Sequence, residues 1–444
     1  MASNANNLHN NLTSSGVLYA DRRDFYIRPN VVKELWTDVS PFTTVIANQN
    51  TVTGLADPQL KMFEHRNPWA KQYFQVGTAV TSAADNGVDT FVVKSGTVVG
   101  MEGASGAYAY NSWIGLTCEV WSALTPGATK KGVVLITGVT GSGTSANFQV
   151  KSMNDTVTGN ILTADGDYLI VIGTAYGEGT VAGTAWADEL QVVYNQCQIF
   201  KTPLQITGTI LAAALRGESS ELARLRDQKS QEHKIQKERA FLFGRNPMNI
   251  SGGFVDNSLS DANDNVVRST MGIIPAIEMH GDTSGVDQSR FTIAEASYTY
   301  SDFVDDMEKV FQYVPEAGVK RAFCGAGALS YWSKMSGSSG MAGNSGWTVS
   351  LGDMKRDALG FNYRVLETPH GALQLIPTPA LRQVYNKTML VVSDENLFHA
   401  QYRAPKFQAN ILTDDAYDGV KDQYMSDEGI GVTLIESHKL FSIS

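Results

Sequence analysis

The sequence predicts an α+β fold into which a separate all-β module is inserted. Residues 216–239 contain 12 charged side chains in 24 positions, which is typical of a long solvated helix. Residues 81–190 hold 17 of the 41 glycines together with short Thr- and Val-rich runs, as expected for strands joined by tight turns. Helical and strand-like patterns then alternate between residues 301 and 441. Helices beside strands that return to one another favour an α+β domain over repeated βαβ units.

Composition and charge exclude several classes of protein. No apolar run approaches the roughly 18 residues of a transmembrane helix, and the first 21 residues lack the basic and apolar regions of a signal peptide. The net charge of −10, with no basic run longer than Lys130–Lys131, argues against tight binding of nucleic acid. The three cysteines are dispersed along the chain, so we expect neither a disulfide framework nor a zinc finger.

The chain begins with a polar segment that leads into an aromatic one. Residues 1–57 open on a stretch without periodicity, after which Pro29 starts a short helical pattern that Pro41 ends. Residues 58–80 mix aromatic and charged side chains, including Phe63, Arg66, Trp69, Tyr73 and Phe74. Two interpretations stay open for this segment: a strand packed on its own domain, or an extension that docks on a neighbouring subunit, where aromatic residues and Arg are favoured.

The β module is predicted over residues 81–189. Strands are expected at 90–93, 132–137, 147–151 and 168–172, bounded by turn signals such as Asn86–Gly87. This spacing is typical of a small barrel or sandwich. Strand-like patterns resume over residues 190–212.

The charged segment predicts a helix over residues 218–243, followed by the stop signal Gly244. Its apolar stripe is thin, and each intrahelical ion pair contributes only about 0.2–0.5 kcal/mol. The helix must therefore lie on another element, with its charged faces toward solvent or neighbouring subunits. The expected pairs are Glu221–Arg224, Lys229–Glu232 and Lys234–Glu238, and Arg224, Lys229 and Glu232 are candidate contacts between subunits.

The C-terminal half carries the alternating elements. Amphipathic patterns predict helices at 301–313 and 328–335, and a Ser/Gly-rich loop follows at 336–346. The predicted strands lie at 319–324, 361–366, 372–376, 389–392 and 430–441.

The sequence shows no recognisable catalytic or cofactor-binding set. Residues 138–143 have the glycine spacing of a phosphate loop, but Thr144 stands where Lys is required. No HExxH or Gly-x-Ser-x-Gly motif occurs, and the seven histidines are dispersed. An acidic cluster at 414–422 leaves a cation site open, although it lacks the Gly and terminal Glu of a calcium loop. We expect a protein that is not an enzyme and needs no cofactor or metal.

Two regions together resemble a known family. An extended segment, residues 198–209, runs into the long charged helix that ends in Glu238–Gly244. Toward the C-terminus, residues 359–364, 389–403 and 424–444 are similar to strands that close a shell subunit. In this order of elements the chain resembles the major capsid proteins of tailed bacteriophages, with the Hong Kong 97-type fold, in the subgroup that carries a β insertion domain in the extended loop.

The resemblance implies a division of the chain into named parts. In order, these are an N-terminal arm (1–57), an extended loop (58–80 and 190–212) carrying the insertion domain (81–189), a peripheral domain (213–300) with a spine helix at 218–243, an axial domain with connecting strands (301–430) whose tip is the loop 336–346, and a last strand that returns to the peripheral domain (431–444).

The resemblance also implies a function. The chain would be a structural protein of the virion that assembles as hexamers and pentamers into an icosahedral head. Its partners would be copies of itself, a portal, a scaffold and decoration or cement proteins, and the head would enclose double-stranded DNA without sequence-specific binding. No membrane contact is expected. Because residues 1–30 lack the charged helical scaffolding segment of some relatives, we expect any scaffold to be a separate protein.

Two alternatives stay open beside the phage capsid. One is an encapsulin-like nanocompartment shell protein, which would have the same fold. The other is a β-rich adhesin or glycan-binding protein, in which Trp113, Trp121 and Trp186 of the β module would form a sugar platform rather than a core.

Overall fold

The computed structural model divides the chain into two compact units. The main unit comprises Met1–Met62 and Val192–Ser444, and the inserted unit comprises Phe63–Gln191. The inserted unit thus begins earlier than the β module predicted from residue 81. The residues that the structure describes are 40–65, 73–78, 89–92, 113–125, 127–140, 147–153, 164–183, 190–212, 220–246, 260–284, 287–313, 318–337, 350–356, 362–411 and 418–444.

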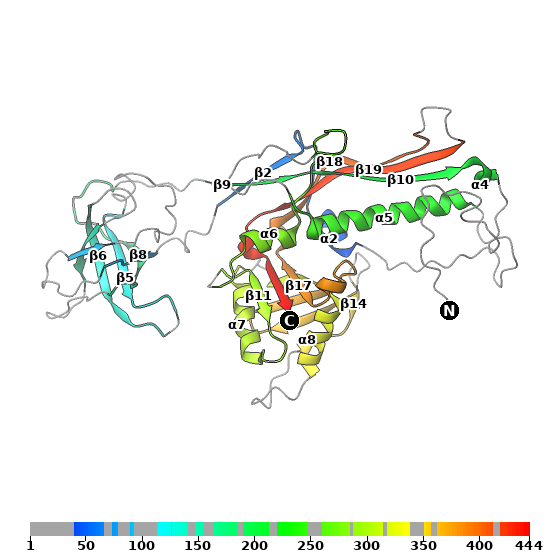
Figure 1. The fold of residues 1–444 in the computed structure, drawn as a ribbon. Helices are drawn as coiled ribbons and strands as arrows, with labels where there is room; N and C mark the ends of the chain where they lie inside the picture. The colour runs from blue at the N-terminus through cyan, green and yellow to red at the C-terminus, as the bar shows by residue number, and fades with distance from the viewer. Residues whose placement is uncertain are drawn as a thin grey trace. The chain divides into compact units, whose positions relative to one another are not determined.

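The centre of the main unit is a mixed eight-stranded sheet (Figure 1). Its strand order is β11-β20-β17-β12-β16-β15-β13, and β14 pairs with β15. Strands β11 and β20 are parallel, as are β12 and β16, whereas β17 runs antiparallel to both of its neighbours. The strands span β11 Arg290–Ile293, β12 Val319–Cys324, β13 Ser350–Leu351, β14 Lys355–Arg356, β15 Asn362–Thr368, β16 Gly371–Pro377, β17 Thr388–Val392 and β20 Lys439–Ile443.

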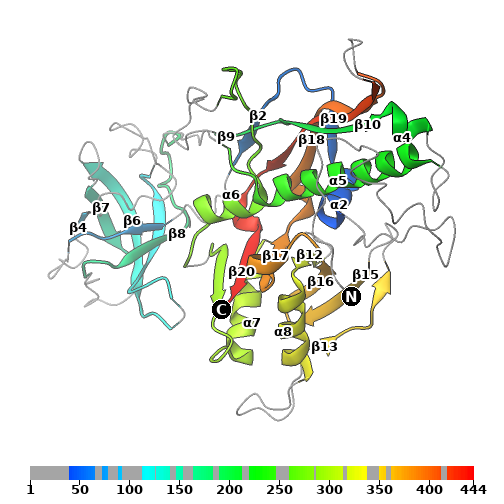
Figure 2. The same cartoon turned by 45° about the vertical axis from the view of Figure 1, so that its right-hand side comes forward.

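Apolar cores cover both faces of this sheet. Successive strand residues point to opposite faces, so in β17 Met389 and Val391 join one core while Leu390 and Val392 join the other. Helices α7 (Tyr300–Phe311) and α8 (Ala326–Gly337) cover the first face (Figure 2). The second core receives side chains from α2 (Pro41–Gln49), α6 (Ile273–His280) and the end of α5 (Glu221–Phe243).

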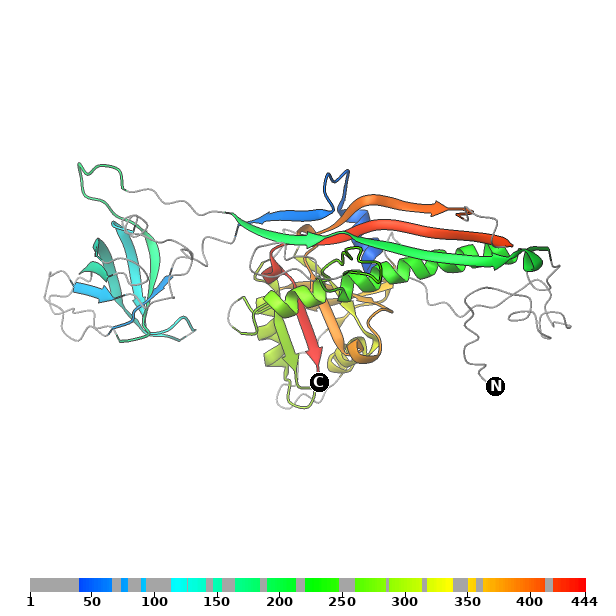
Figure 3. The same ribbon diagram turned by 45° about the horizontal axis from the view of Figure 1, so that its top comes forward.

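A second sheet of the main unit has four strands in the order β1-β18-β19-β10. Its long strands are β10 (Gln198–Thr207), β18 (Leu397–Gln408) and β19 (Gly419–Val432), with the short β1 (Thr51–Thr53) at one edge. Figure 3 shows α5 running along these strands. The short helix α4 (Gly208–Ala212) directly follows β10.

Two strands flank the inserted unit where the chain passes from one unit to the other. Strand β2 (Gln59–Glu64) pairs with β9 (Gln191–Gln196) in a separate two-stranded sheet. We refer to this pair as the stem.

The inserted unit is one six-stranded sheet in the order β3-β8-β5-β6-β7-β4. Gly77 N donates to Val92 O over 2.7 Å, which joins the chain after β3 to the end of β4. The sheet therefore curls until its two edges meet around a core, as in a small barrel. Its strands are β3 Tyr73–Gln75, β4 Asp89–Val92, β5 Leu116–Trp121, β6 Lys130–Thr140, β7 Asn147–Ser152 and β8 Tyr168–Thr174.

The long helix predicted over 218–243 is confirmed as α5. Ser220 caps it by accepting from Ala223 N, and Gly244 follows its last residue. The single strand predicted at 430–441 is wrong. Strand β19 ends at Val432, and Leu434 then adopts φ +47°, starting a turn that separates β19 from β20. Pro41 opens helix α2, since Pro is favoured in the first turn. The helical pattern predicted after Pro29 lies outside the described residues.

Two strand pairings bear on the parts named above. The last strand, expected to return to the peripheral domain (213–300), pairs as β20 with β11, which lies within that range, and with β17. Strands β18 and β19, which fall mainly in the range given to the axial domain and connecting strands (301–430), form one sheet with β10 beside α5. Hydrophobicity alone does not reveal strand partners, because both sheets use Val- and Ile-rich segments. Among the helices that the structure describes, none is both long enough and apolar enough to span a membrane.

Candidate assembly surfaces

Helix α5 contacts the four-stranded sheet through polar side chains along its middle and through an apolar cluster of Leu225 and Ile206 near its start. Arg226 Nη2 lies 2.7 Å from Asp422 Oδ2, and Lys237 Nζ lies 3.1 Å from Glu428 Oε2. Between these two ion pairs, the buried His233 ring joins two strands, with Nδ1 2.9 Å from Thr202 Oγ1 and Nε2 3.1 Å from Ser426 Oγ. The thin apolar stripe of α5 is thus complemented by ion pairs and hydrogen bonds.

Strand β19 supplies three fully buried acids to the main unit. Glu428 is paired with Lys237 and His399, and Asp427 with Arg268 and Arg403. Burial opposes ionisation of Glu428, but the hydrogen bond from His399 and the charge of Lys237 outweigh it and hold its pKa below the usual range. A buried carboxylate is tolerated only with such partners.

This polar interface was missed by the sequence prediction, although the helix carries a signal for it. Arg226, His233 and Lys237 lie seven and four residues apart, which places them on one helical face. Alternation along β19 puts Asp422, Ser426 and Glu428 on the facing side of the strand.

The C-terminal end of α5 is held differently, in an apolar core. Phe241 and Leu242 are essentially fully buried. The Phe241 ring lies 6.3 Å from that of Phe200 on β10 and 5.7 Å from that of His399 on β18. The helix is therefore anchored at this end by burial of apolar surface.

One further buried acid of α5, Glu238, turns toward helix α2. Its Oε1 accepts from Phe42 N over 3.1 Å, and its Oε2 accepts from Thr43 N over 2.8 Å and Thr43 Oγ1 over 2.7 Å. The predicted pair Lys234–Glu238 is therefore wrong. Glu238 is only 2% exposed, whereas Lys234 lies on the solvent side of the helix.

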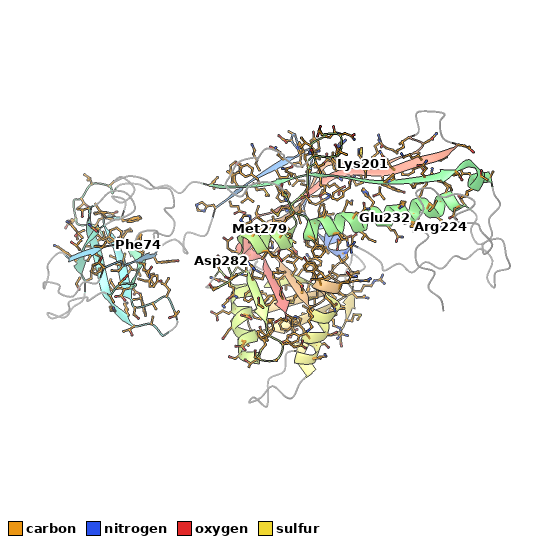
Figure 4. The ribbon with its side chains drawn as sticks, viewed as in Figure 1. Phe74, Lys201, Arg224, Glu232, Met279 and Asp282 are labelled. Atoms are coloured by element: carbon orange, nitrogen blue, oxygen red, sulfur yellow. The ribbon has the colours of Figure 1, made fainter. Side chains whose placement is uncertain are left out.

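The other two predicted pairs on α5 are confirmed. Arg224 Nη2 lies 2.6 Å from Glu221 Oε1, and Lys229 Nζ lies 2.7 Å from Glu232 Oε2. Figure 4 places Arg224 and Glu232 along the helix. The Lys229 and Glu232 side chains remain 30% and 40% exposed, so this pair is accessible from outside the main unit.

The candidate contact residues of the segment 58–80 lie in different environments. Phe63 is 68% exposed on β2, as an intersubunit contact requires. Tyr73 is half-buried against the Tyr168 ring, at 6.0 Å. Phe74 is 3% exposed and packs at 4.5 Å against Trp113 in the core of the inserted unit, so its prediction as a surface contact is wrong (Figure 4). Arg66 and Trp69 lie outside the described residues.

The described residues contain no group of His, Cys, Asp or Glu side chains arranged to hold a metal ion. In the acidic cluster at 414–422, Asp422 is engaged by Arg226 and by the backbone N–H of Asn410. Asp414 and Asp415 lie outside the described range, as does much of the glycine-rich segment after Thr140.

The tryptophans of the inserted unit were candidates for a core or, in the adhesin alternative, for a sugar platform, and Trp113 belongs to the core. Trp113 is 4% exposed and contacts Phe74 and Phe148. Trp121 is half-buried, and its Nε1 donates to Glu119. Trp186 lies outside the described residues.

Comparisons with known proteins identify the chain's family. The model of the SU10 major capsid protein family matches residues 41–432. No curated protein matches the chain. Among solved structures, it is similar to the capsid of a native GTA particle, with 10% identity over 62% of this chain and 81% of that chain and a TM-score of 0.39. It is also similar to a structure from Mycobacterium phage Patience (15% identity, 61% and 78% covered, TM-score 0.35) and to the SrpI encapsulin of Synechococcus elongatus (6%, 57% and 77%, 0.37).

The family match spans the main unit from helix α2 to the end of β19 and includes the inserted unit. A major capsid protein is structural, and it forms the capsid shell of the virion together with copies of itself. The chain belongs to the SU10 major capsid protein family.

Proposed function

We propose that this capsid protein assembles as hexamers and pentamers into the icosahedral head of a tailed phage. The head would enclose double-stranded DNA without sequence-specific binding, in keeping with a net charge of −10. A portal, a scaffold and decoration proteins would be its partners. The observation that carries the proposal is the family match over residues 41–432.

Within this function, the parts of the chain would have separate tasks. The main unit, with apolar cores on both faces of its larger sheet, would serve as the rigid tile. Residues 1–57 and the extended loop around the stem would overlap neighbouring subunits. Several modest contacts per subunit then act together, because each contact made raises the effective concentration for the next.

Two surfaces fit these intersubunit contacts. Phe63 projects an aromatic ring from the stem, and aromatic side chains are favoured at interfaces. The exposed Lys229–Glu232 pair on α5 offers a neighbour two charges of opposite sign.

The family match favours the phage capsid over both alternatives. A nanocompartment shell would share the fold but would lie beside a cargo enzyme in its genome, whereas a phage head protein would lie beside terminase and portal genes. The adhesin alternative is weakened because Trp113 lies in the core of the inserted unit and is not available for a sugar platform.

The proposal is tested by expressing the full chain and imaging it by negative-stain electron microscopy. We expect closed shells or hexameric rings, and dispersed monomers at high protein concentration, with or without co-expressed scaffold, would contradict the proposal. Phe63→Ser should reduce particle yield without lowering the unfolding temperature. Val181→Ser, at an 89% exposed position of the inserted unit, is the matched control. Unchanged yield for Phe63→Ser would contradict the stem contact alone.

A further inference from the structure

The four-stranded sheet of the main unit has one face against α5 and another face that points away from it. Successive residues of a strand point to opposite faces of a sheet. Thr202 on β10, Ser426 on β19 and Phe407 on β18 point toward α5, since each contacts a side chain of that helix. Their neighbours along each strand therefore point away from α5, and we call the surface that they form the outer face.

The strand pairing arranges the outer face in rows that cross β10, β19 and β18. In order, the rows are Ile199–Asp427–Arg403, Lys201–Met425–Lys406, Pro203–Gln423–Gln408 and Gln205–Lys421. Lys201 is labelled in Figure 4. Neighbouring strands lie about 4.8 Å apart and alternate residues about 6.8 Å apart, so the outer face measures about 10 by 20 Å.

The charges of the outer face are mainly of one sign. Its exposed cations are Lys201, Arg403 and Lys406, and Lys421 is half-buried. The acid in these rows, Asp427, is fully buried and already paired with two arginines. Within the described part of the chain, no ion pair engages Lys201, Lys406 or Lys421. A solvated surface usually intersperses both signs, whereas this one is cationic in a chain with a net charge of −10.

Apolar side chains lie between these cations. Ile199 is 40% exposed, Pro203 is exposed, and Met425 lies between Lys201 and Lys406 in one row. Protein interfaces combine an apolar centre with a polar rim. Nucleic acid is instead held through many phosphate contacts, which need cations and make no use of apolar surface. The composition of the outer face therefore favours a protein partner over nucleic acid.

A strand of the chain itself already lies on one end of this face. Ala400 on β18 is paired with Gly429, two residues along β19 from Asp427, and so continues the outer face beyond the first row. Leu60 of strand β2 packs on Ala400 in a small apolar cluster. Beyond this cluster Lys201 and its neighbours are exposed. The outer face thus accepts an extended segment at one end and is open to a second one along the rest.

We propose that the outer face binds an extended acidic segment of a separate partner protein. An extended chain rises about 3.3 Å per residue, so about six residues span the length of the face. Alternate side chains of this segment would point to the sheet, with carboxylates over the lysines and an apolar side chain over Met425. No strand that the structure describes exposes two acids on one face, which favours a separate protein over a second copy of this chain. The proposal rests on the proposed function, because this partner would be one of the proteins that bind the shell.

Binding of a fluorescent peptide to the full chain, followed by anisotropy, tests the proposal. The probe is Asp-Thr-Leu-Thr-Asp-Thr-Leu-Thr-Asp, which places Asp and Leu side chains on one side of an extended chain. In the comparison peptide Asn replaces each Asp. We expect the acidic peptide to bind, and to bind less tightly as salt is raised from about 50 to about 300 mM, because the charges are exposed. The Asn peptide should not bind.

Two double variants locate the binding on the outer face. Lys201→Gln combined with Lys406→Gln should weaken binding of the acidic peptide by about tenfold, since each exposed ion pair contributes about two- to fivefold. Lys234→Gln combined with Arg239→Gln removes the same charge from exposed positions of α5 and should leave binding unchanged.

Three results would overturn the proposal. The first is that the acidic peptide does not bind, or that both double variants weaken its binding equally. The second is tighter binding of a short duplex DNA that also depends on Lys201 and Lys406, which would assign the face to nucleic acid. The third is reduced self-association of the Lys201→Gln/Lys406→Gln chain with unchanged peptide binding, which would assign the face to a second copy. Peptide binding is measured whether or not shells form, so a failure to assemble would count against the proposed function alone.

Discussion

The two sheets of the main unit are held to their helices by different interactions. The eight-stranded sheet meets α7 and α8 through an apolar core that includes Phe303, Trp332 and Phe441. Two buried lysines, Lys320 and Lys439, lie on the same face of the sheet and donate to backbone carbonyls. The four-stranded sheet meets the middle of α5 through Arg226–Asp422, His233 and Lys237–Glu428, and meets its two ends through the apolar contacts of Leu225 and Phe241.

The two helix–sheet interfaces contribute different things: one contributes stability, and the other sets the position of the helix along the strands. Apolar contacts contribute free energy in proportion to the area they bury and have little directional preference. Buried ion pairs contribute little net stability, because desolvation offsets their attraction. Removing one partner is nevertheless strongly destabilising, because it leaves the other charge buried without a partner. We infer that the first interface provides rigidity, whereas the second fixes where the long helix sits along the strands.

The largest effect is expected from breaking the apolar interface. Trp332 is fully buried and contacts the rings of Phe303 and Phe441. Trp332→Ala should lower the free energy of unfolding by about 3–5 kcal/mol, since it leaves a large cavity. Denaturant unfolding followed by circular dichroism measures it. Trp332→Phe is the control, with a smaller loss, and a loss below about 1 kcal/mol for the alanine variant would contradict an apolar core as the main source of rigidity.

A smaller effect is expected from the polar interface. Asp422→Asn removes a charge that Arg226 contacts, and should cost about 1.5–3 kcal/mol, as for a hydrogen bond to a charged group. The loss is limited because the Arg226 side chain is 35% exposed and can turn to water. A double-mutant cycle with Arg226→Gln isolates the pair, and additive losses would show that the two residues do not fix the helix together.

The smallest effect is expected on the outer face of α5. Lys229→Ala removes one exposed intrahelical pair and should cost about 0.2–0.5 kcal/mol in the dispersed subunit, less at high salt. Thermal unfolding at two salt concentrations measures this loss. A loss above 1 kcal/mol in the dispersed subunit would place this pair with the buried contacts rather than with the surface.

The sequence predicts those elements whose signals are local. The charged run and Gly244 locate α5, and the boundaries predicted for β12 agree with the structure. Helix α6 escapes prediction because Pro275 lies in its first turn, where it is tolerated but is commonly taken for a boundary. The partners of β18, β19 and β20 depend on pairings across long stretches of chain that no local pattern records.

The candidate contact residues show the same limit. The pairs Glu221–Arg224 and Lys229–Glu232 follow from helical spacing alone. Phe74 could not be distinguished from Phe63 by sequence, since both are aromatic and lie near charged residues, yet one is in a core and the other is exposed. The capping of α2 by Glu238 joins positions far apart in the chain and could be found only from coordinates.

The stem formed by β2 and β9 has a consequence for the history of the chain. It brings together the two points at which the chain leaves and rejoins the main unit, so the core of that unit does not depend on what lies between them. A domain attached by two adjacent strands can be gained, exchanged or lost in evolution without rerouting the rest of the polypeptide. The same stem offers a site for grafting a foreign domain onto a capsid subunit.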